Sequence, residues 1–325
     1  MEPYQPVVDA YLDFARHATD SPTFVEWSLE VAADVALQRM IAALPPIKQQ
    51  PNLIFAAARW LGAPAPGPYA GFRDVLISRW PDVVAVVTTH ATQTNEVGRL
   101  ATLVPAFAQV AQGRPIALLE VGCSAGLCLH PDGYRYRWVG AQSQVELGDG
   151  PVLECQVSGP VPVPEALPEI GWRGGIDLNP LDVANPDHVA WLENLIFPEH
   201  QDRRDRLREA VRIARREPVE VVRGDLLAEL PGLLERVPGS LTPVVFHTAV
   251  IAYLEPDDRE RFAAMMRELV AEGRCHWVSN EGANVLASVT ASAGAIEVGN
   301  RFVLGIDGRA VALTQSHGRA LDWLT

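Results

Sequence analysis

The fold of this 325-residue chain is decided by the stretch Leu118-Leu119-Glu120-Val121-Gly122-Cys123-Ser124-Ala125-Gly126. A short apolar run leads to an acidic residue and then to a glycine-rich turn. This order is typical of doubly wound α/β folds, which hold nucleotides at the carboxyl ends of their strands. Gly122 allows a tight turn, and Gly126 allows the backbone to approach a ligand closely. We expect a helix to follow the turn and to point its free N–H groups at an anionic group.

After Ile116, short apolar runs alternate with helical patterns. Strands are predicted at 116–122, 175–178, 220–225, 244–247 and 275–281, and a hairpin at 301–306 and 310–315 around Asp307-Gly308. Five βα-type units followed by a hairpin predict a Rossmann-like α/β sheet, mostly parallel, with an antiparallel last strand. Alternating aromatic residues at Tyr134, Tyr136 and Trp138 predict a β-hairpin and loop inserted at about 134–172.

The N-terminal third of the chain carries helical patterns only. Prolines and glycines at 62–68 interrupt these patterns with a surface linker. The last helix is expected from about Asn95 to Gln112, closed by Gly113. We therefore expect an all-helical cap domain at 1–112 and a Rossmann-like domain at 113–325.

Composition excludes several classes of function. A net charge of −13 disfavours a nucleic-acid partner. The arginine-rich stretch 203–216 is interleaved with acidic residues, and Leu207, Ala210, Val211 and Ala214 form an apolar stripe, so it is predicted to be a surface helix with internal ion pairs. No apolar run approaches the roughly 20 residues of a membrane span. The four cysteines show no disulfide framework, and we expect a cytoplasmic protein. The sequence does not predict the oligomeric state.

Three kinds of site find no support in the sequence. Lys48 is the chain's single lysine, and it lies in a proline-rich loop, which suits neither a phosphate-binding P-loop nor a pyridoxal Schiff base. The eight histidines form no cluster with metal-ligand spacing, so no metal site is predicted.

The glycine-rich turn resembles the acidic-x-Gly-x-Gly-x-Gly pattern of class I methyltransferases, with Ser124 at the middle glycine. Asp177 and Asp225 close the second and third strands, where such folds place acids on the ribose hydroxyls and near the adenine. The resemblance implies an S-adenosylmethionine (SAM) site. Its residues would be Glu120, Gly122, Ser124, Gly126, Asp177 and Asp225. The alternatives are an ordinary strand-to-helix turn and acids that cap helices.

The resemblance extends over essentially the whole chain. It is carried by 92–99, 119–127, 134–136, 177–182, 245–250, 277–282 and 317–319. Together these segments resemble the bacterial family called domain of unknown function 2332. That resemblance implies a methyltransferase-like fold and no established reaction.

Candidate chemistry follows from position. His247 ends the fourth strand, where a base could deprotonate a methyl acceptor, with Tyr253 and Glu281 as second-rank catalytic candidates. The alternatives are a histidine hydrogen-bonded inside the sheet edge, a packing tyrosine and a glutamate paired with an arginine. The N-terminal helices are predicted to form a lid that brings Gln93, Asn95, Glu96 and Arg99 to a small-molecule substrate. The alternative is a helix-capping network.

Three hypotheses remain open. The first is a SAM-dependent methyltransferase that acts on a small molecule. The second is a non-catalytic SAM or nucleotide sensor. The third is a serine hydrolase, because Gly122-Cys123-Ser124-Ala125-Gly126 also fits the Gly-x-Ser-x-Gly elbow, with His317 as its base.

Overall fold

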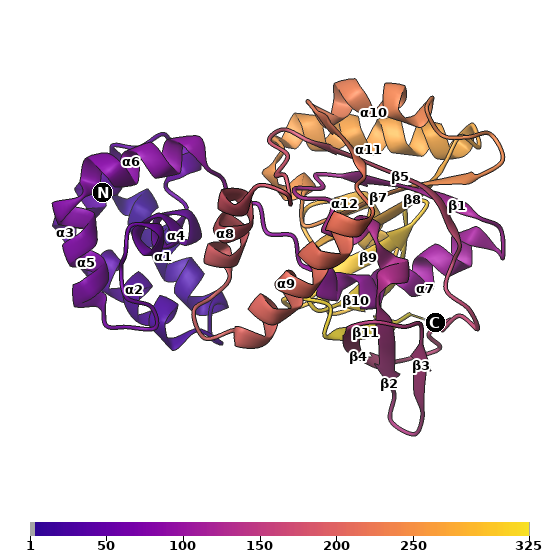
Figure 1. Ribbon diagram of the computed structural model, residues 1–325, viewed down its shortest axis with the longest axis horizontal. Coiled ribbons are helices and arrows are strands. Elements are labelled where there is room, and N and C mark those ends of the chain that lie inside the picture. Colours follow the sequence, from indigo (N-terminus) through magenta and orange to yellow (C-terminus); the bar gives the residue numbers. More distant parts are fainter. Residues whose placement is uncertain (1–3, 325) are drawn as a thin grey trace. The chain divides into compact units, whose positions relative to one another are not determined.

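The computed structural model describes residues 4–324 and divides them into two compact units (Figure 1). Unit 1 contains the residues up to Thr94 together with Ala184–Arg208. Unit 2 contains Asn95–Val183 and the residues from Glu209 onward. Each unit therefore consists of two separate stretches of the chain.

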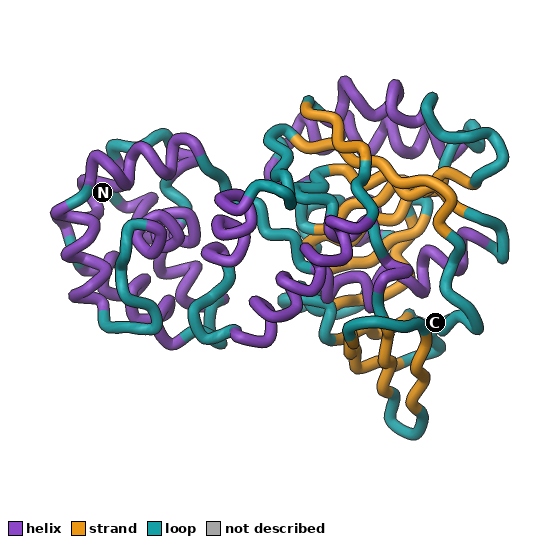
Figure 2. Tube along the Cα trace, in the orientation of Figure 1, coloured by secondary structure: helices purple, strands orange, loops and turns teal. Residues whose placement is uncertain are grey.

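Unit 1 is helical throughout its regular elements, as Figure 2 shows. It contains α1 (Gln5–His17), α2 (Pro22–Ala33), α3 (Val35–Ala42), η1 (Pro46–Lys48), α4 (Pro51–Trp60), α5 (Tyr69–Ser78), α6 (Trp80–Thr89) and α8 (Pro186–Leu195). Ser21 caps α2 by accepting a hydrogen bond from Phe24 N, as its position before Pro22 predicts.

The returning stretch 184–208 is tied to unit 1 by directed hydrogen bonds. Glu199 accepts hydrogen bonds from Ser21 Oγ at 2.6 Å and from Thr23 N at 2.9 Å. The guanidinium of Arg59 donates to the carbonyl oxygens of Asn194 and Ile196, both at 2.7 Å. Because these partners lie more than 130 residues apart in the sequence, local patterns could not have revealed that this stretch completes the helical unit.

Unit 2 contains one mixed sheet of eleven strands in the order β3-β2-β4-β11-β10-β9-β8-β7-β1-β5-β6. The strands are β1 (Ile116–Val121), β2 (Arg135–Val139), β3 (Gln144–Leu147), β4 (Val152–Ser158), β5 (Ile170–Asp177), β6 (Glu220–Arg223), β7 (Thr242–Thr248), β8 (His276–Gly282), β9 (Phe302–Ile306), β10 (Arg309–Thr314) and β11 (Ala320–Trp323). Strands β6, β5, β1, β7 and β8 are parallel neighbours, and β9 pairs antiparallel with β8. The prediction of a mostly parallel α/β sheet is confirmed.

The segment 134–172 is part of this sheet rather than a hairpin set apart from it. β2 pairs antiparallel with β3 and parallel with β4, and β4 pairs parallel with β11 at the end of the chain (Figure 1). Strands β3 and β11 were not predicted from the sequence. Each has only four residues, and one of the two partners of β11, strand β4, lies more than 150 residues away, so neither carries a periodic signal of useful length.

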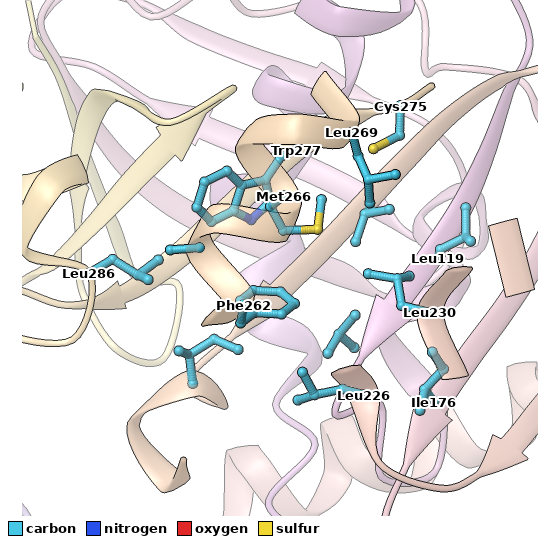
Figure 3. Packing of buried hydrophobic residues seen from close by; sticks show 14 of the residues in the cluster. Leu119, Ile176, Leu226, Leu230, Phe262, Met266, Leu269, Cys275, Trp277 and Leu286 are labelled. Atoms are coloured by element: carbon cyan, nitrogen blue, oxygen red, sulfur yellow. The ribbon is translucent and has the colours of Figure 1, made fainter. Parts of the chain in front are cut away.

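Helices cover both faces of the sheet (Figure 1). α10 (Leu226–Leu234) and α11 (Pro256–Ala271) pack on one face in a core that includes Leu119 and Trp277 (Figure 3). α7 (Leu100–Ala111) packs on the other face, where the rings of Phe107 and Phe246 lie 5.1 Å apart. Because side chains alternate along a strand, Glu120 points to the α7 face, opposite to Leu119.

The α-helix expected directly after Gly126 is absent from the described chain, and this prediction was wrong. Two single 3₁₀ turns follow instead, η3 (Leu127–Leu129) and η4 (Pro131–Gly133). Pro131 disfavours helical backbone at His130, whose φ is −116°. The glycine-rich turn therefore lacks the row of free N–H groups that a helix would have pointed at an anion. Similarly, the helix expected from Asn95 begins only at Leu100, after η2 (Val97–Arg99).

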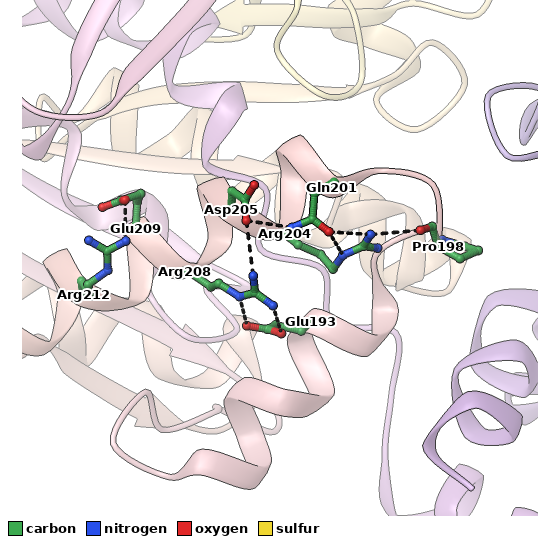
Figure 4. Close-up of polar contacts among 8 residues, drawn as sticks. All are labelled: Glu193, Pro198, Gln201, Arg204, Asp205, Arg208, Glu209 and Arg212. Atoms are coloured by element: carbon green, nitrogen blue, oxygen red, sulfur yellow. Dashed lines mark hydrogen bonds and ion pairs between the residues drawn. The ribbon is translucent and has the colours of Figure 1, made fainter. Parts of the chain in front are cut away.

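The arginine-rich segment forms α9 (Gln201–Arg216), and its prediction as an ion-paired surface helix is confirmed (Figure 4). Arg208 pairs with Glu193 at 2.8 Å, and Arg212 pairs with Glu209. Leu207 and Val211 of the apolar stripe are buried. Within residues 4–324, no helix has both the length and the apolar character that a membrane span requires.

Candidate functional site

The turn after β1 is held by the end of β5. The N–H groups of Gly122 and Cys123 donate to Ile176 O, and Ser124 N donates to Asp177 Oδ2 at 2.8 Å. Gly122 and Gly126 both have a φ of +69°. A Cβ on Gly122 would lie 2.3 Å from the side chain of Val250. Gly122 is therefore required by the turn itself and by the packing of Val250 against it.

Strained backbone follows two neighbouring strands. Ser124 after β1 has a φ of +52°, and Ala249 after β7 has a φ of +56°, although neither residue is a glycine. Left-handed backbone of this kind costs a non-glycine residue about 1 kcal/mol or more and is concentrated at functional sites. Since β1 and β7 are parallel neighbours, both strained residues lie at the same edge of the sheet. This edge, formed by the carboxyl ends of the parallel strands, is the candidate site.

Two acids expected to bind the cofactor make backbone hydrogen bonds. Asp177 is half-buried and accepts from Ser124 N and Asn179 N, both at 2.8 Å. Asp225 is exposed and caps α10 by accepting from Leu227 N and Ala228 N. Asp225 thus has the helix-capping contacts of the alternative interpretation, whereas Asp177 joins the glycine-rich turn to the loop after β5.

Glu120 is a buried carboxyl group at the site, with a side chain from β1 that is 2% exposed. Its Oε2 atom has no hydrogen-bond partner among the described residues. Burial raises the pKa of Glu120 well above its usual range, the nearby charge of Asp177 raises it further, and the guanidinium of Arg99 lowers it in part. The site therefore contains a carboxyl group that favours its neutral form.

This pKa makes stability depend on pH, and Glu120→Gln is expected to remove that dependence. The folded chain retains the carboxyl proton to a higher pH than the unfolded chain. The contribution of Glu120 to wild-type stability is therefore greatest below the ordinary Glu range and falls as pH rises toward the raised pKa, by about tenfold in the folding equilibrium constant per pH unit. Urea unfolding between about pH 5 and pH 8 measures the two slopes. Equal slopes for both proteins would contradict the assignment.

The predicted base His247 is fully buried on the α11 face of the sheet. Its Nδ1 lies 2.7 Å from Glu281 Oε1, and its Nε2 accepts a hydrogen bond from Trp277 Nε1 at 3.0 Å. Because the indole N–H is a donor only, the imidazole proton lies on Nδ1 and is donated to Glu281. Both ring nitrogens are thus engaged, in the geometry of a histidine hydrogen-bonded inside the sheet.

Glu281 anchors the loop after β7. Besides the imidazole, its Oε1 atom accepts from Val250 N at 3.0 Å and Ile251 N at 3.2 Å, while Oε2 is buried with no partner in the described chain. The loop then forms η5 (Ile251–Tyr253), where Tyr253 is 60% exposed. Of the three catalytic candidates, Tyr253 is the one accessible from solvent.

The segment before α7 contacts the same edge. Asn95 Oδ1 accepts from Leu127 N at 2.8 Å, next to the glycine-rich turn. Glu96 caps η2 through Gly98 N. Arg99 is 7% exposed and donates to Thr248 O at 3.0 Å and to Ser316 O at 2.7 Å. Gln93 lies in the irregular segment at the end of unit 1's first stretch. Asn95, Glu96 and Arg99 are therefore near the strand ends, where they hold the protein's own backbone.

Two features of the edge were missed from the sequence. Leu178 follows Asp177 directly and is 70% exposed, the highest exposed fraction among the large apolar residues of the described chain. Asn280 is fully buried and links two strands, because it donates to Thr248 Oγ1 and accepts from Thr314 Oγ1. Leu178 could have been noticed as an apolar residue inside a strand-end motif, but the partners of Asn280 are visible only in the fold.

The described part of the chain contains no group of three or more histidine, cysteine or acidic side chains that could hold a metal ion. All four cysteines are buried and free of disulfides, and burial raises the pKa of Cys123 and Cys128. Neither thiol is therefore suited to act as a nucleophile.

The large, mostly parallel sheet covered by helices places this protein in the α/β class. Strained turns and the buried side chain of Glu120 lie at the edge formed by the carboxyl ends of its strands. The chain belongs to DUF2332, a family described as an uncharacterised protein conserved in bacteria, whose model matches residues 8–323. The family resemblance of the sequence motifs is thereby confirmed. No curated protein and no solved structure matches the chain.

Proposed function

We propose that this protein is a SAM-dependent methyltransferase that acts on a small molecule. The observation that carries the proposal is the strand order. The five parallel neighbours follow the order third, second, first, fourth, fifth along the chain. In doubly wound sheets of this order, ligands bind outside the carboxyl ends where the order reverses, which is between β1 and β7. The glycine-rich turn, Ser124 and Ala249 lie at that point.

The residues at this edge fit such a cofactor in part. Asp177 accepts hydrogen bonds from Ser124 N and Asn179 N, and we assign its carboxylate to the ribose hydroxyls of the cofactor. Glu120 offers a buried oxygen without a partner. Gly122 does not offer an open cradle, because Val250 fills the space beside it. Asp225 is committed to α10 through Oδ1, so its proposed place near the adenine would use Oδ2.

Two exposed apolar side chains flank the turn and suit a planar ligand. Leu178 follows β5 and Tyr253 lies beyond β7, with β1 between these strands. Since neighbouring strands are about 4.8 Å apart, the two strand ends lie roughly 10 Å from each other. We assign Leu178 as the apolar contact of the adenine ring, because burying it would recover the free energy that its exposure costs.

The chain's own groups would mainly position the acceptor. S-adenosylmethionine would supply an electrophilic methyl group. Tyr253 is the catalytic candidate that can reach an acceptor, through its exposed hydroxyl. His247 and Glu281 would act by holding the loop that carries Tyr253. The substrate-binding roles of Gln93, Asn95, Glu96 and Arg99 stay predictions. Asn95, Glu96 and Arg99 would fix the loops around the acceptor.

One observation favours the sensor as a second candidate. Both ring nitrogens of His247 and one oxygen of Glu281 are used by structural hydrogen bonds, which leaves no accessible base on β7. A sensor would bind SAM without producing a methylated product. The hydrolase gains no such support, because Ser124 is buried and no α-helix follows its turn in the described chain.

Calorimetric titration with SAM tests the proposal, and Leu178→Glu is expected to weaken binding tenfold or more. Removing a buried leucine contact costs roughly 1.5–3 kcal/mol, and 1.4 kcal/mol is a factor of ten. The substituted side chain is exposed in the unliganded protein, so its melting temperature should remain unchanged.

Val145→Glu is the matched control. It makes the same kind of exchange at an exposed position of β3, far across the sheet from β5, and should bind SAM like the wild type. Wild-type protein that does not bind SAM would refute the proposed function. Undiminished binding by Leu178→Glu would refute the assignment of Leu178.

A further inference from the structure

The Oε2 atom of Glu120 has no hydrogen-bond partner among residues 4–324, although it is buried and a partner is expected there. A buried acceptor without a hydrogen bond costs free energy, and a buried charge without a counter-charge costs far more. Glu120 lies on the α7 face near the end of β1, immediately before the turn at which the ligand is proposed to bind. The unpartnered oxygen of Glu120 therefore lies at the candidate site and not in the distant core.

The groups around Glu120 make its surroundings unfavourable for an added negative charge. Asp177 acts on it from the end of β5, and the burial of Glu120 adds to the cost of a charge there. Arg99 is the cation that acts on it from η2. Within the described chain, no ion pair joins Arg99 to Glu120, and the Nε and Nη1 groups of Arg99 donate to Ser316 O and Thr248 O.

We propose that Glu120 carries a proton in the unliganded protein and releases it when a positively charged group of the ligand becomes its partner. The O–H bond of the carboxyl group breaks, the proton passes to solvent, and the carboxylate pairs with the cation. This inference rests on the proposed function for the choice of ligand, since SAM carries both an ammonium and a sulfonium group. It assigns to this site a preference for cationic ligands and a linkage between binding and proton release.

Calorimetry in two buffers of different ionisation enthalpy, at about pH 7, measures the proton release directly. The probes are SAM, S-adenosylhomocysteine, which lacks the sulfonium charge, and 5′-methylthioadenosine, which lacks the ammonium as well. Wild-type protein should release about one proton on binding SAM and none on binding 5′-methylthioadenosine. Release with S-adenosylhomocysteine would identify the ammonium as the partner, and its absence would identify the sulfonium.

Glu120→Gln should release no proton and should bind SAM roughly tenfold more weakly, because the charge-assisted bond is lost. Asp307→Asn is the control, since Asp307 lies at the opposite edge of the sheet, bonded to Trp277 N and His276. It should release a proton as the wild type does. SAM binding with equal enthalpy in both buffers, or proton release by Glu120→Gln, would overturn the inference while leaving the proposed function intact.

A second measurement decides the inference without a ligand. Carbon NMR of the side-chain carboxyl groups, compared between wild type and Glu120→Gln, reports whether Glu120 is protonated at neutral pH. A resonance of protonated carboxyl that disappears in the variant supports the proposal. An ionised Glu120 in the unliganded protein overturns it, even if none of the three probes binds and the proposed function fails separately.

Discussion

Replacing Glu281 with alanine is expected to destabilise the protein by about 3–5 kcal/mol, because three buried donors lose their common acceptor. These donors are His247 Nδ1, Val250 N and Ile251 N. Leaving a buried donor unsatisfied costs about 1–3 kcal/mol each, although such costs are not strictly additive. Urea unfolding measures the loss, and hydrogen exchange should show faster exchange at the amides of Val250 and Ile251.

Glu281→Gln is the control for this substitution. The glutamine side chain keeps a carbonyl oxygen at the position of Oε1, so most of the protection at the loop after β7 should remain. An alanine variant with wild-type exchange at Val250 and Ile251 would show that Glu281 does not hold this loop.

The second large effect is expected for Arg99→Met, which should lower stability by roughly 3 kcal/mol and the melting temperature by about 6–12 °C. Methionine preserves much of the apolar stem but removes the donors to Thr248 O and Ser316 O. It also removes the positive charge that acts on Glu120. The loss therefore separates η2, the end of β7 and the loop after β10, which Arg99 joins. Differential scanning calorimetry measures the change.

Arg261→Met on α11 is the matched control. Arg261 is exposed and pairs with Asp258 three residues earlier, so its replacement should change the melting temperature by about 1 °C or less. If Arg99→Met melts like the wild type and still loses SAM binding, Arg99 belongs to the binding surface and not to the support of the loops.

The sequence predicted the central sheet because each βα unit carries its own signal. The apolar run before Glu120, the acid at Asp177 and the Asp307-Gly308 turn are local patterns, and the sheet contains strands at all of them. The pairing of β4 with β11 and the return of 184–208 to the helical unit depend on contacts between distant segments. No periodicity within either segment encodes its partner.

The candidate site was predictable as a location but not as a set of contacts. Strand ends identified the edge where Glu120, Asp177 and His247 lie, because parallel strands end on one side. The register of a strand decides which face of the sheet each side chain points to, since neighbouring residues on a strand point in opposite directions. Register places Glu120 beneath α7 and His247 beneath α11, and the sequence alone did not separate them.

The two-stretch composition of each unit has a consequence for biosynthesis. The ribosome completes residues 1–94 early, but α8 and the Glu199 side chain that bonds Ser21 emerge only after more than 80 further residues of unit 2 have been made. Strand β1 also emerges before its neighbours β5 and β7 exist. Neither unit can therefore complete its packing until its second stretch has been synthesised. For the same reason, no single cleavage of the polypeptide separates two intact units.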